Sequence, residues 1–338
     1  MDWFERLTGF KEQDFAGTQA QLELDGRQLR SRINGRSYGI GELELVSLET
    51  LRQRIVPDAG GAGRLKLSVV EGDVRQLHQA PELAGALFQV ASQFNLLEMT
   101  GPGVTPENGV TRYAGDLTQG PACAMAAGAA TIYRNYFVPV GEQIGQRRHR
   151  QLDGLADLGV ELAVRTGLSR EKLWTMQNGY ALCSREGLAA ISRHLASLDD
   201  GRRDALRGLL RIGVHRDVEV TDVDRPVPHR VSQAFCSALP VAYGQAVPKA
   251  CWADFATLVL EAAYEATLWV AVANAQRGAS NVVLLTRLGG GVFGNEGAWI
   301  YAAMRRALQR VRDYELDVQL VSFNRPTQEM LQLQSEFG

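Results

Sequence analysis

A glycine-rich loop is the stretch of this sequence best suited to bind a charged ligand. Its glycines are residues 289–291 and Gly294, and an apolar run, Val282–Leu285, comes just before them. Glycine lets backbone N–H groups approach an anion closely, and the N-terminus of a following helix adds positive potential. The loop therefore predicts a phosphate-binding site, although a tight turn without a ligand would have the same composition.

The spacing of this loop argues against two common nucleotide-binding motifs. It is not Gly-x-x-x-x-Gly-Lys-Ser/Thr, so we do not expect a P-loop nucleotidase. It also departs from the dinucleotide pattern Gly-x-Gly-x-x-Gly, because no acidic residue stands at the end of a following strand. The loop alone names no ligand.

The elements around the loop form one supersecondary unit. The apolar run before it is typical of a strand buried on both faces. From Ala298, apolar residues recur at three- and four-residue spacing as far as Val311, which predicts a helix. Residues 318–323 predict a second strand. The unit is therefore strand, loop, helix and strand, joined by a right-handed parallel crossover.

Outside this unit, the sequence predicts an accessory module, a linker, an insertion and a long irregular loop. Residues 1–57 should form an N-terminal β-rich accessory module, and residues 57–63 a linker, by composition. Residues 141–230 should form a mostly helical insertion. Residues 100–119 have no period, and an irregular loop of that length is often functional. In chain order, the patterns predict hairpins at Asp25-Gly26, Asn34-Gly35 and Asn178-Gly179, strands over residues 42–47, 65–74, 86–92 and 231–238, and helices over residues 122–136, 151–165, 187–198, 202–212 and 252–276.

The composition is that of an ordinary globular protein. The chain has 338 residues, of which 45% are hydrophobic, and its net charge of −2 gives no electrostatic reason to wrap nucleic acid. Its four cysteines are far apart, and its histidines lack the spacing of a zinc site, so we expect no metal and no cofactor. With no leader-like N-terminus and no long apolar run, we expect a soluble, cytoplasmic protein without a membrane partner.

Several segments, in order, resemble the macrodomain superfamily, which binds ADP-ribose. Residues 69–74, Val-Val-Glu-Gly-Asp-Val, are similar to its first strand motif ending in Gly-Asp-Ile. Residues 87–95 resemble the strand that ends in Phe-Ala-Ser or Phe-Ala-Asn in the glycohydrolase branch. Residues 289–295, ending Gly-Val-Phe-Gly-Asn, look most like the phosphate loop of the bacterial type of poly(ADP-ribose) glycohydrolase. The match covers residues 62–140 and 231–325.

This resemblance implies a three-layer α/β/α core and a role for individual residues. Asp73 would accept a hydrogen bond from the adenine amino group, or else it caps the next helix. Phe323 or Asn324 would pack against the adenine ring, or else Phe323 belongs to the core. Asn95 would face the distal ribose. The pyrophosphate would lie on the second loop, whose ligand-binding residues are Gly289, Gly290, Gly291, Val292, Phe293, Gly294 and Asn295.

The chain departs from the glycohydrolases at the position of the catalytic acid. Members of that branch have Gln-Glu-Glu at a helix start, and a glutamate protonates the leaving group. Here the matching residues are Gln119, Gly120 and Pro121, so the glutamine is kept and both glutamates are missing. Cleavage of a glycosidic bond needs a carboxylic acid near the scissile oxygen. The carboxylates nearby are Glu98, Glu107 and Asp116. Asp116 is the first candidate for the acid and Glu107 the second, or else each is a surface charge.

Three functions therefore stay open for this sequence. The chain would be an ADP-ribosyl hydrolase, with Asn95, Asp116, Gln119 and Glu107 around the reacting ribose. It would otherwise be a binding module for ADP-ribose without catalysis, which the missing glutamates favour, or a scaffold that binds no nucleotide. Its expected partner is ADP-ribose or an ADP-ribosylated substrate, and nucleic acid is expected only where it carries that group.

Overall fold

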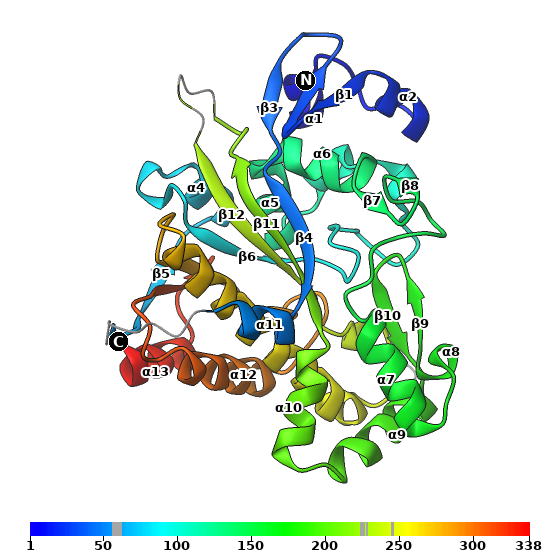
Figure 1. The fold of residues 1–338 in the computed structure, drawn as a ribbon, viewed down its shortest axis with the longest axis vertical. Coiled ribbons are helices and arrows are strands. Elements are labelled where there is room, and N and C mark those ends of the chain that lie inside the picture. The colour runs from blue at the N-terminus through cyan, green and yellow to red at the C-terminus, as the bar shows by residue number, and fades with distance from the viewer. Residues whose placement is uncertain (56–62, 224–226, 228, 245–246) are drawn as a thin grey trace.

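The computed structural model describes residues 1–55, 63–223, 227, 229–244 and 247–338. Its centre is a seven-stranded sheet in the order β4-β11-β12-β6-β13-β14-β5 (Figure 1). Five neighbouring strands, from β12 to β5, run parallel, whereas β11 is antiparallel to both of its neighbours. The strands are β4 (Glu42–Ser47), β5 (Lys66–Glu71), β6 (Leu87–Ala91), β11 (Arg211–Glu219), β12 (Arg230–Cys236), β13 (Val282–Leu285) and β14 (Asp317–Ser322).

Helices cover both faces of this sheet, so the predicted three-layer α/β/α core is confirmed. The faces separate by the alternation of side chains along each strand. Leu87 and Val283 point to one core cluster, and Phe88 and Leu284 to the other. One face carries α3 (Leu48–Arg54), α11 (Ala253–Gln276), α12 (Gly297–Arg310) and α13 (Gln328–Phe337), and the other carries α4 (Val74–Gln79), α5 (Gln119–Ala126) and α6 (Gly128–Tyr136).

Around the glycine-rich loop, the predicted order of strand, loop, helix and parallel strand is confirmed. Strand β13 leads through the loop into α12, and β14 then pairs with β13 in parallel register, Val283 opposite Val318. The core strands β5, β6 and β12 and the long helix α11 also lie within a few residues of their predicted positions. The single helix predicted over residues 122–136 is broken at Ala127, which separates α5 from α6.

Two strands lie outside the core that the sequence predicted. Strand β4, predicted as part of the N-terminal module, forms the edge of the central sheet, where Val46 pairs with Ile212 of β11. The helix predicted over residues 202–212 ends at Gly208, and β11 begins at Arg211. Ile212, Val214 and Val218 are buried, because β11 lies between two other strands. Pairing within the sheet therefore determines the structure from Arg211 onward, although the spacing over residues 202–212 predicts a helix.

The remaining elements lie at two ends of the core (Figure 1). At one end, a three-stranded sheet is preceded by two short helices that the sequence did not predict. They are α1 (Trp3–Thr8), α2 (Phe15–Ala20), β1 (Leu22–Asp25), β2 (Gln28–Ser31) and β3 (Ser37–Gly39). The predicted linker over residues 57–63 lies, except for Gly63, outside the described residues. The remaining helices and strands lie between α6 and β11 in the chain. They are β7 (Pro139–Val140), β8 (Gln143–Ile144), α7 (Ala156–Thr166), α8 (Arg170–Leu173), β9 (Trp174–Gln177), β10 (Tyr180–Cys183), α9 (Arg185–Ala196) and α10 (Asp200–Gly208).

One helical segment is long and apolar enough to cross a membrane. It spans Lys249–Gln276, and the mean hydropathy of its most apolar window is 1.4. Since 83% of that window is buried inside the fold, its composition is what the central helix of a large core requires.

Candidate active site

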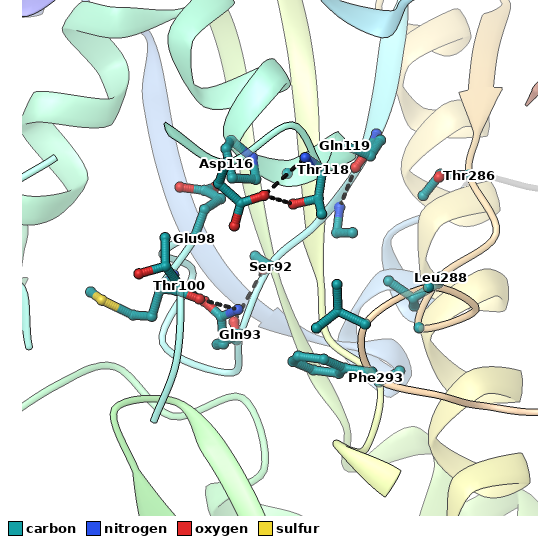
Figure 2. A pocket seen from close by; sticks show the side chains of 18 of the residues that line it. Ser92, Gln93, Glu98, Thr100, Asp116, Thr118, Gln119, Thr286, Leu288 and Phe293 are labelled. Carbon is teal, nitrogen blue, oxygen red and sulfur yellow. Dashed lines mark hydrogen bonds between the residues drawn. The ribbon is translucent and has the colours of Figure 1, made fainter. Parts of the chain in front are cut away.

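A pocket of about 190 Å³ opens at the carboxyl ends of β6, β12 and β13. This is the edge at which parallel α/β sheets bind ligands. Figure 2 shows Leu288 and Phe293 facing Gln93, Thr100 and Asp116 across the pocket. The lining residues are Ala91, Ser92, Gln93, Glu98, Met99, Thr100, Asp116, Thr118, Gln119, Gly120, Pro121, Tyr180, Ala238, Tyr243, Thr286, Arg287, Leu288, Gly289, Gly291, Val292 and Phe293.

The glycine-rich loop forms one wall of the pocket and is fixed by Asn295. The Asn295 side chain donates to the carbonyls of Leu239, at 2.9 Å, and Gly289, at 3.3 Å. Gly289 has a φ of +72°, and a Cβ there would lie 2.4 Å from the Cβ of Ala238. The loop thus requires glycine at this point. Asn295, predicted as a ligand contact, is buried beneath the loop and does not line the pocket.

Three consecutive N–H groups of this loop are available to a ligand. Within the described part of the chain, no acceptor is hydrogen-bonded to the N–H of Gly291, Val292 or Phe293. Gly290 and Gly294 differ, because their N–H groups donate to the carbonyls of Arg287 and Gly291. Amide groups in such a row form an anion-binding concavity. Of the seven residues predicted to bind the ligand, Gly289, Gly291, Val292 and Phe293 thus have N–H groups without an acceptor in the described part of the chain, whereas Gly290, Gly294 and Asn295 donate within the loop.

Gln119 and Asp116 line the pocket as predicted, but both hold the local backbone. The Gln119 amide donates to the carbonyl of Gln89 and accepts from the N–H of Ala91, at 2.8 Å each, and so continues the pairing of β6. One Asp116 oxygen accepts from the N–H and the hydroxyl of Thr118, at 2.9 and 2.6 Å (Figure 2). These contacts fix the start of α5.

Two predicted catalytic residues lie outside the pocket lining. Asn95 is fully buried, and its amide donates to Gln151 and accepts from the N–H of Leu97, so it cannot face a ribose. Ser92 and Gln93 take the place at the end of β6 that was predicted for it. Glu107 accepts from the N–H of Arg148 at 2.9 Å. Burial raises the pKa of Glu107, but this hydrogen bond and others outweigh burial and lower it overall.

The residues predicted to contact adenine lie beyond the pocket, at the same edge of the sheet. Asp73 follows β5, and Phe323 and Asn324 follow β14, which pairs with β5. Asp73 caps α4, accepting from the N–H of Arg75 at 2.8 Å, so the capping alternative is confirmed. Phe323 is 75% exposed, which rules out the alternative that it belongs to the core. None of the three lines the pocket.

Glu98 is the carboxyl group that the sequence did not select. It is 1% exposed, yet it lines the floor of the pocket. One of its oxygens, Oε1, lies 3.4 Å from Nη2 of Arg134. The other, Oε2, is buried and has no hydrogen-bond partner in the described chain. The available signal was a lone acidic residue between apolar neighbours, Leu96 and Leu97 before it and Met99 after it.

Burial sets the protonation of this group. It raises the pKa of Glu98 to about 7, although Arg134 acts in the opposite direction. Glu98 can therefore hold a proton near neutral pH and release it during a reaction. A general acid or base works best with a pKa near the operating pH. Glu98 is thus a pocket-lining group whose protonation suits proton transfer.

The raised pKa predicts how stability depends on pH. Glu98 binds its proton more tightly in the folded than in the unfolded chain, so its contribution to stability is complete below about pH 4.5 and lost as the pH rises through about 7. Between pH 5 and 8, the free energy of unfolding of the wild type should fall by about 2–3 kcal/mol more than that of Glu98→Gln, because glutamine cannot titrate. Urea unfolding at several pH values measures this difference. The exposed Glu82, changed to Gln, should give a curve parallel to the wild type, and parallel curves for Glu98→Gln would contradict the burial argument.

Comparisons with known proteins give structural neighbours only. No protein-family model matches the chain, and no curated protein sequence matches it significantly. The structure is similar to poly(ADP-ribose) glycohydrolase from Deinococcus radiodurans in complex with ADP-ribose, with 14% identity, a TM-score of 0.44, and coverage of 87% of this chain and 93% of that one. The enzyme from Thermomonospora curvata gives 13% identity, a TM-score of 0.45, and coverage of 95% and 94%. Similarity of this degree assigns no residue a role in this chain.

Proposed function

We propose that the protein binds an ADP-ribosyl group and hydrolyses the glycosidic bond at its distal ribose. The observation that carries this proposal is a buried carboxyl group, Glu98, in the same pocket as three free loop N–H groups. The N–H groups supply what a pyrophosphate needs, and the carboxyl group supplies the proton that a leaving oxygen needs.

The ligand would run along the carboxyl edge of the sheet. Its pyrophosphate would accept from the N–H groups of Gly291, Val292 and Phe293. The distal ribose would enter the pocket, where Glu98 lies. The adenosine would extend outward over the ends of β14 and β5, where Phe323 offers an exposed ring. This orientation combines the adenine contact predicted for Phe323 with the pocket.

Glu98 would act first as an acid and then as a base. As the bond between the ribose C1 and the leaving oxygen breaks, protonated Glu98 gives its proton to that oxygen. Water then adds to C1, and its surplus proton returns to the Glu98 carboxylate. The products are free ADP-ribose and the released hydroxyl or carboxylic acid of the target. Asp116 remains a second candidate for the acid, because it also lines the pocket.

Turnover of ADP-ribosylated protein tests this function. We expect release of ADP-ribose at pH 6, where Glu98 is protonated, and a decline above about pH 7 as the proton is lost. Binding of ADP-ribose without release from any linkage would instead favour the binding module. The specific observation in favour of that second function is that Gln119 and Asp116 both bond the local backbone. If the protein neither binds ADP-ribose nor releases it from a modified protein, the scaffold that binds no nucleotide is the remaining function.

The exposed ring of Phe323 gives a prediction for binding. Phe323→Ala should weaken ADP-ribose binding about tenfold, because stacking of a base on an aromatic side chain contributes about 1–3 kcal/mol. Its thermal unfolding should not change, since the ring is 75% exposed. Val164→Ala, which truncates another exposed apolar side chain on α7, should leave binding unchanged. Calorimetry measures the affinity of both variants for ADP-ribose. Equal affinities would show that the adenine does not lie at the end of β14.

A further inference from the structure

A fully buried arginine, Arg134 on α6, lies beside the carboxyl group at the floor of the pocket. From its contacts we infer that Arg134 is a positioning residue that orients Glu98 for proton transfer. This inference rests on the proposed function for its link to turnover, whereas the pairing itself can be measured without substrate.

The Arg134 guanidinium is held in one place by contacts on several elements. Nε donates to the carbonyl of Leu96 at 3.1 Å, and Nη2 donates to the hydroxyl of Thr131 at 3.0 Å. The carbon Cζ lies 3.9 Å from the centre of the Phe235 ring. A planar guanidinium with fixed donors leaves one geometry for its remaining partner. That partner is Oε1 of Glu98.

Anchoring Oε1 leaves the other oxygen of Glu98 to the pocket. Within the described chain, Oε2 has no hydrogen-bond partner, although it is buried. Glu98 also follows a tight turn in which Leu96 has a φ of +63°, a conformation that costs energy for leucine. The bond from Arg134 to the Leu96 carbonyl stabilises this turn. Arg134 therefore fixes both the backbone before Glu98 and one oxygen of its side chain.

Three titratable groups around this pair, Tyr113, Cys123 and His215, are neutral near pH 7, and Asp116 also lines the pocket. Burial raises the pKa of Tyr113 and of Cys123 on α5 well above their usual values. Burial and the charge of Arg134 lower the pKa of His215 on β11. Since arginine only donates, Nδ1 of His215 accepts from Nη1 at 3.5 Å, which also requires the neutral ring. Arg134 is thus the group that favours the ionised form of Glu98.

Removing this charge should move the protonation of Glu98. In Arg134→Met, the pH at which the Glu98 carboxyl titrates should rise by ~1–3 pH units, the size expected when an opposite charge within about 4–6 Å is lost. The alkaline limit of turnover should rise with it, and turnover at pH 6 should fall about tenfold or more, because the carboxyl loses its orientation. Arg134→Lys keeps the charge and should keep the titration within about one pH unit of the wild type while turnover still falls.

Carbon-13 NMR of the Glu98 carboxyl in the full chain without ligand measures the titration directly. If Arg134→Met does not fold, Thr131→Val removes one partner of the guanidinium and should raise the titration in the same direction by a smaller amount. Arg306→Met is the matched control, because Arg306 pairs with Glu265 and Asp204 outside the pocket. It should lower the melting temperature without moving the titration of Glu98.

The outcomes separate this inference from the proposed function. A Glu98 titration unchanged in both Arg134→Met and Thr131→Val would overturn the positioning role, whatever the turnover. A shifted titration together with a shifted alkaline limit of turnover supports it. If the variants shift the titration of Glu98 but the wild type shows no turnover, the pairing of Arg134 with Glu98 is supported and the proposed hydrolysis is wrong. Arg134 would then have no role in catalysis.

Discussion

Glu98→Gln should lose turnover by about a hundredfold or more while still binding ADP-ribose. General acid catalysis contributes about 10²–10⁴-fold, and glutamine cannot donate the proton. At pH 6 the wild-type carboxyl is protonated, so the amide resembles it in shape and charge, and affinity should change by less than about threefold. Release of ADP-ribose from modified protein and calorimetry at pH 6 measure the two quantities.

Two further carboxyl variants make this result specific. Glu107→Gln should keep wild-type turnover, because Glu107 lies outside the pocket lining and bonds the backbone of Arg148. Asp116→Asn tests the acid that the sequence favoured. If Asp116→Asn loses turnover by a hundredfold while Glu98→Gln retains it, the acid is Asp116 and the assignment to Glu98 is wrong.

Gly291→Glu should abolish ADP-ribose binding and leave the fold intact. A Cβ on Gly291 meets no atom within 4 Å, and its backbone has no strained φ, so the chain accommodates a side chain there. The carboxylate would stand among the N–H groups proposed for the pyrophosphate and would repel it. Juxtaposed like charges cost several kcal/mol, which corresponds to a loss of affinity of more than about a hundredfold. Calorimetry and thermal unfolding measure binding and stability.

The control for this variant adds the same charge elsewhere. Gly201 lies in α10, and its added Cβ would make only an ordinary contact of 3.6 Å with Asp199. Gly201→Glu should bind ADP-ribose as the wild type does. If folded Gly291→Glu still binds ADP-ribose, the pyrophosphate does not lie on this loop.

The core of the fold could be predicted because its signals are local. Val282–Leu285 is a short apolar run followed by glycines, and the helix after it repeats at the correct spacing, so strand, loop and helix were each readable alone. Strand β11 could not be read this way. Its pairing between β4 and β12 joins segments far apart in the chain, and only that pairing buries Ile212 and Val214.

The site was less predictable, because residue type does not reveal what a side chain contacts. Asn95 and Gln119 carry suitable groups at suitable positions, but their amides bond neighbouring chain segments. Sequence alone favours Asp116 over Glu98, because Asp116 is the carboxylate closest to Gln119 along the chain. Glu98, a lone acid flanked by apolar residues, and Arg134, the single arginine of an alanine-rich helix, together indicate a buried pair. Only the fold shows that the pair lies under the pocket.

The central claim is tested most directly by a crystal structure of Glu98→Gln with ADP-ribose bound. We expect the pyrophosphate oxygens within about 3 Å of the N–H groups of Gly291, Val292 and Phe293, and C1 of the distal ribose in the pocket beside residue 98. A distal ribose that points out of the pocket, with C1 beyond reach of residue 98, would contradict the account.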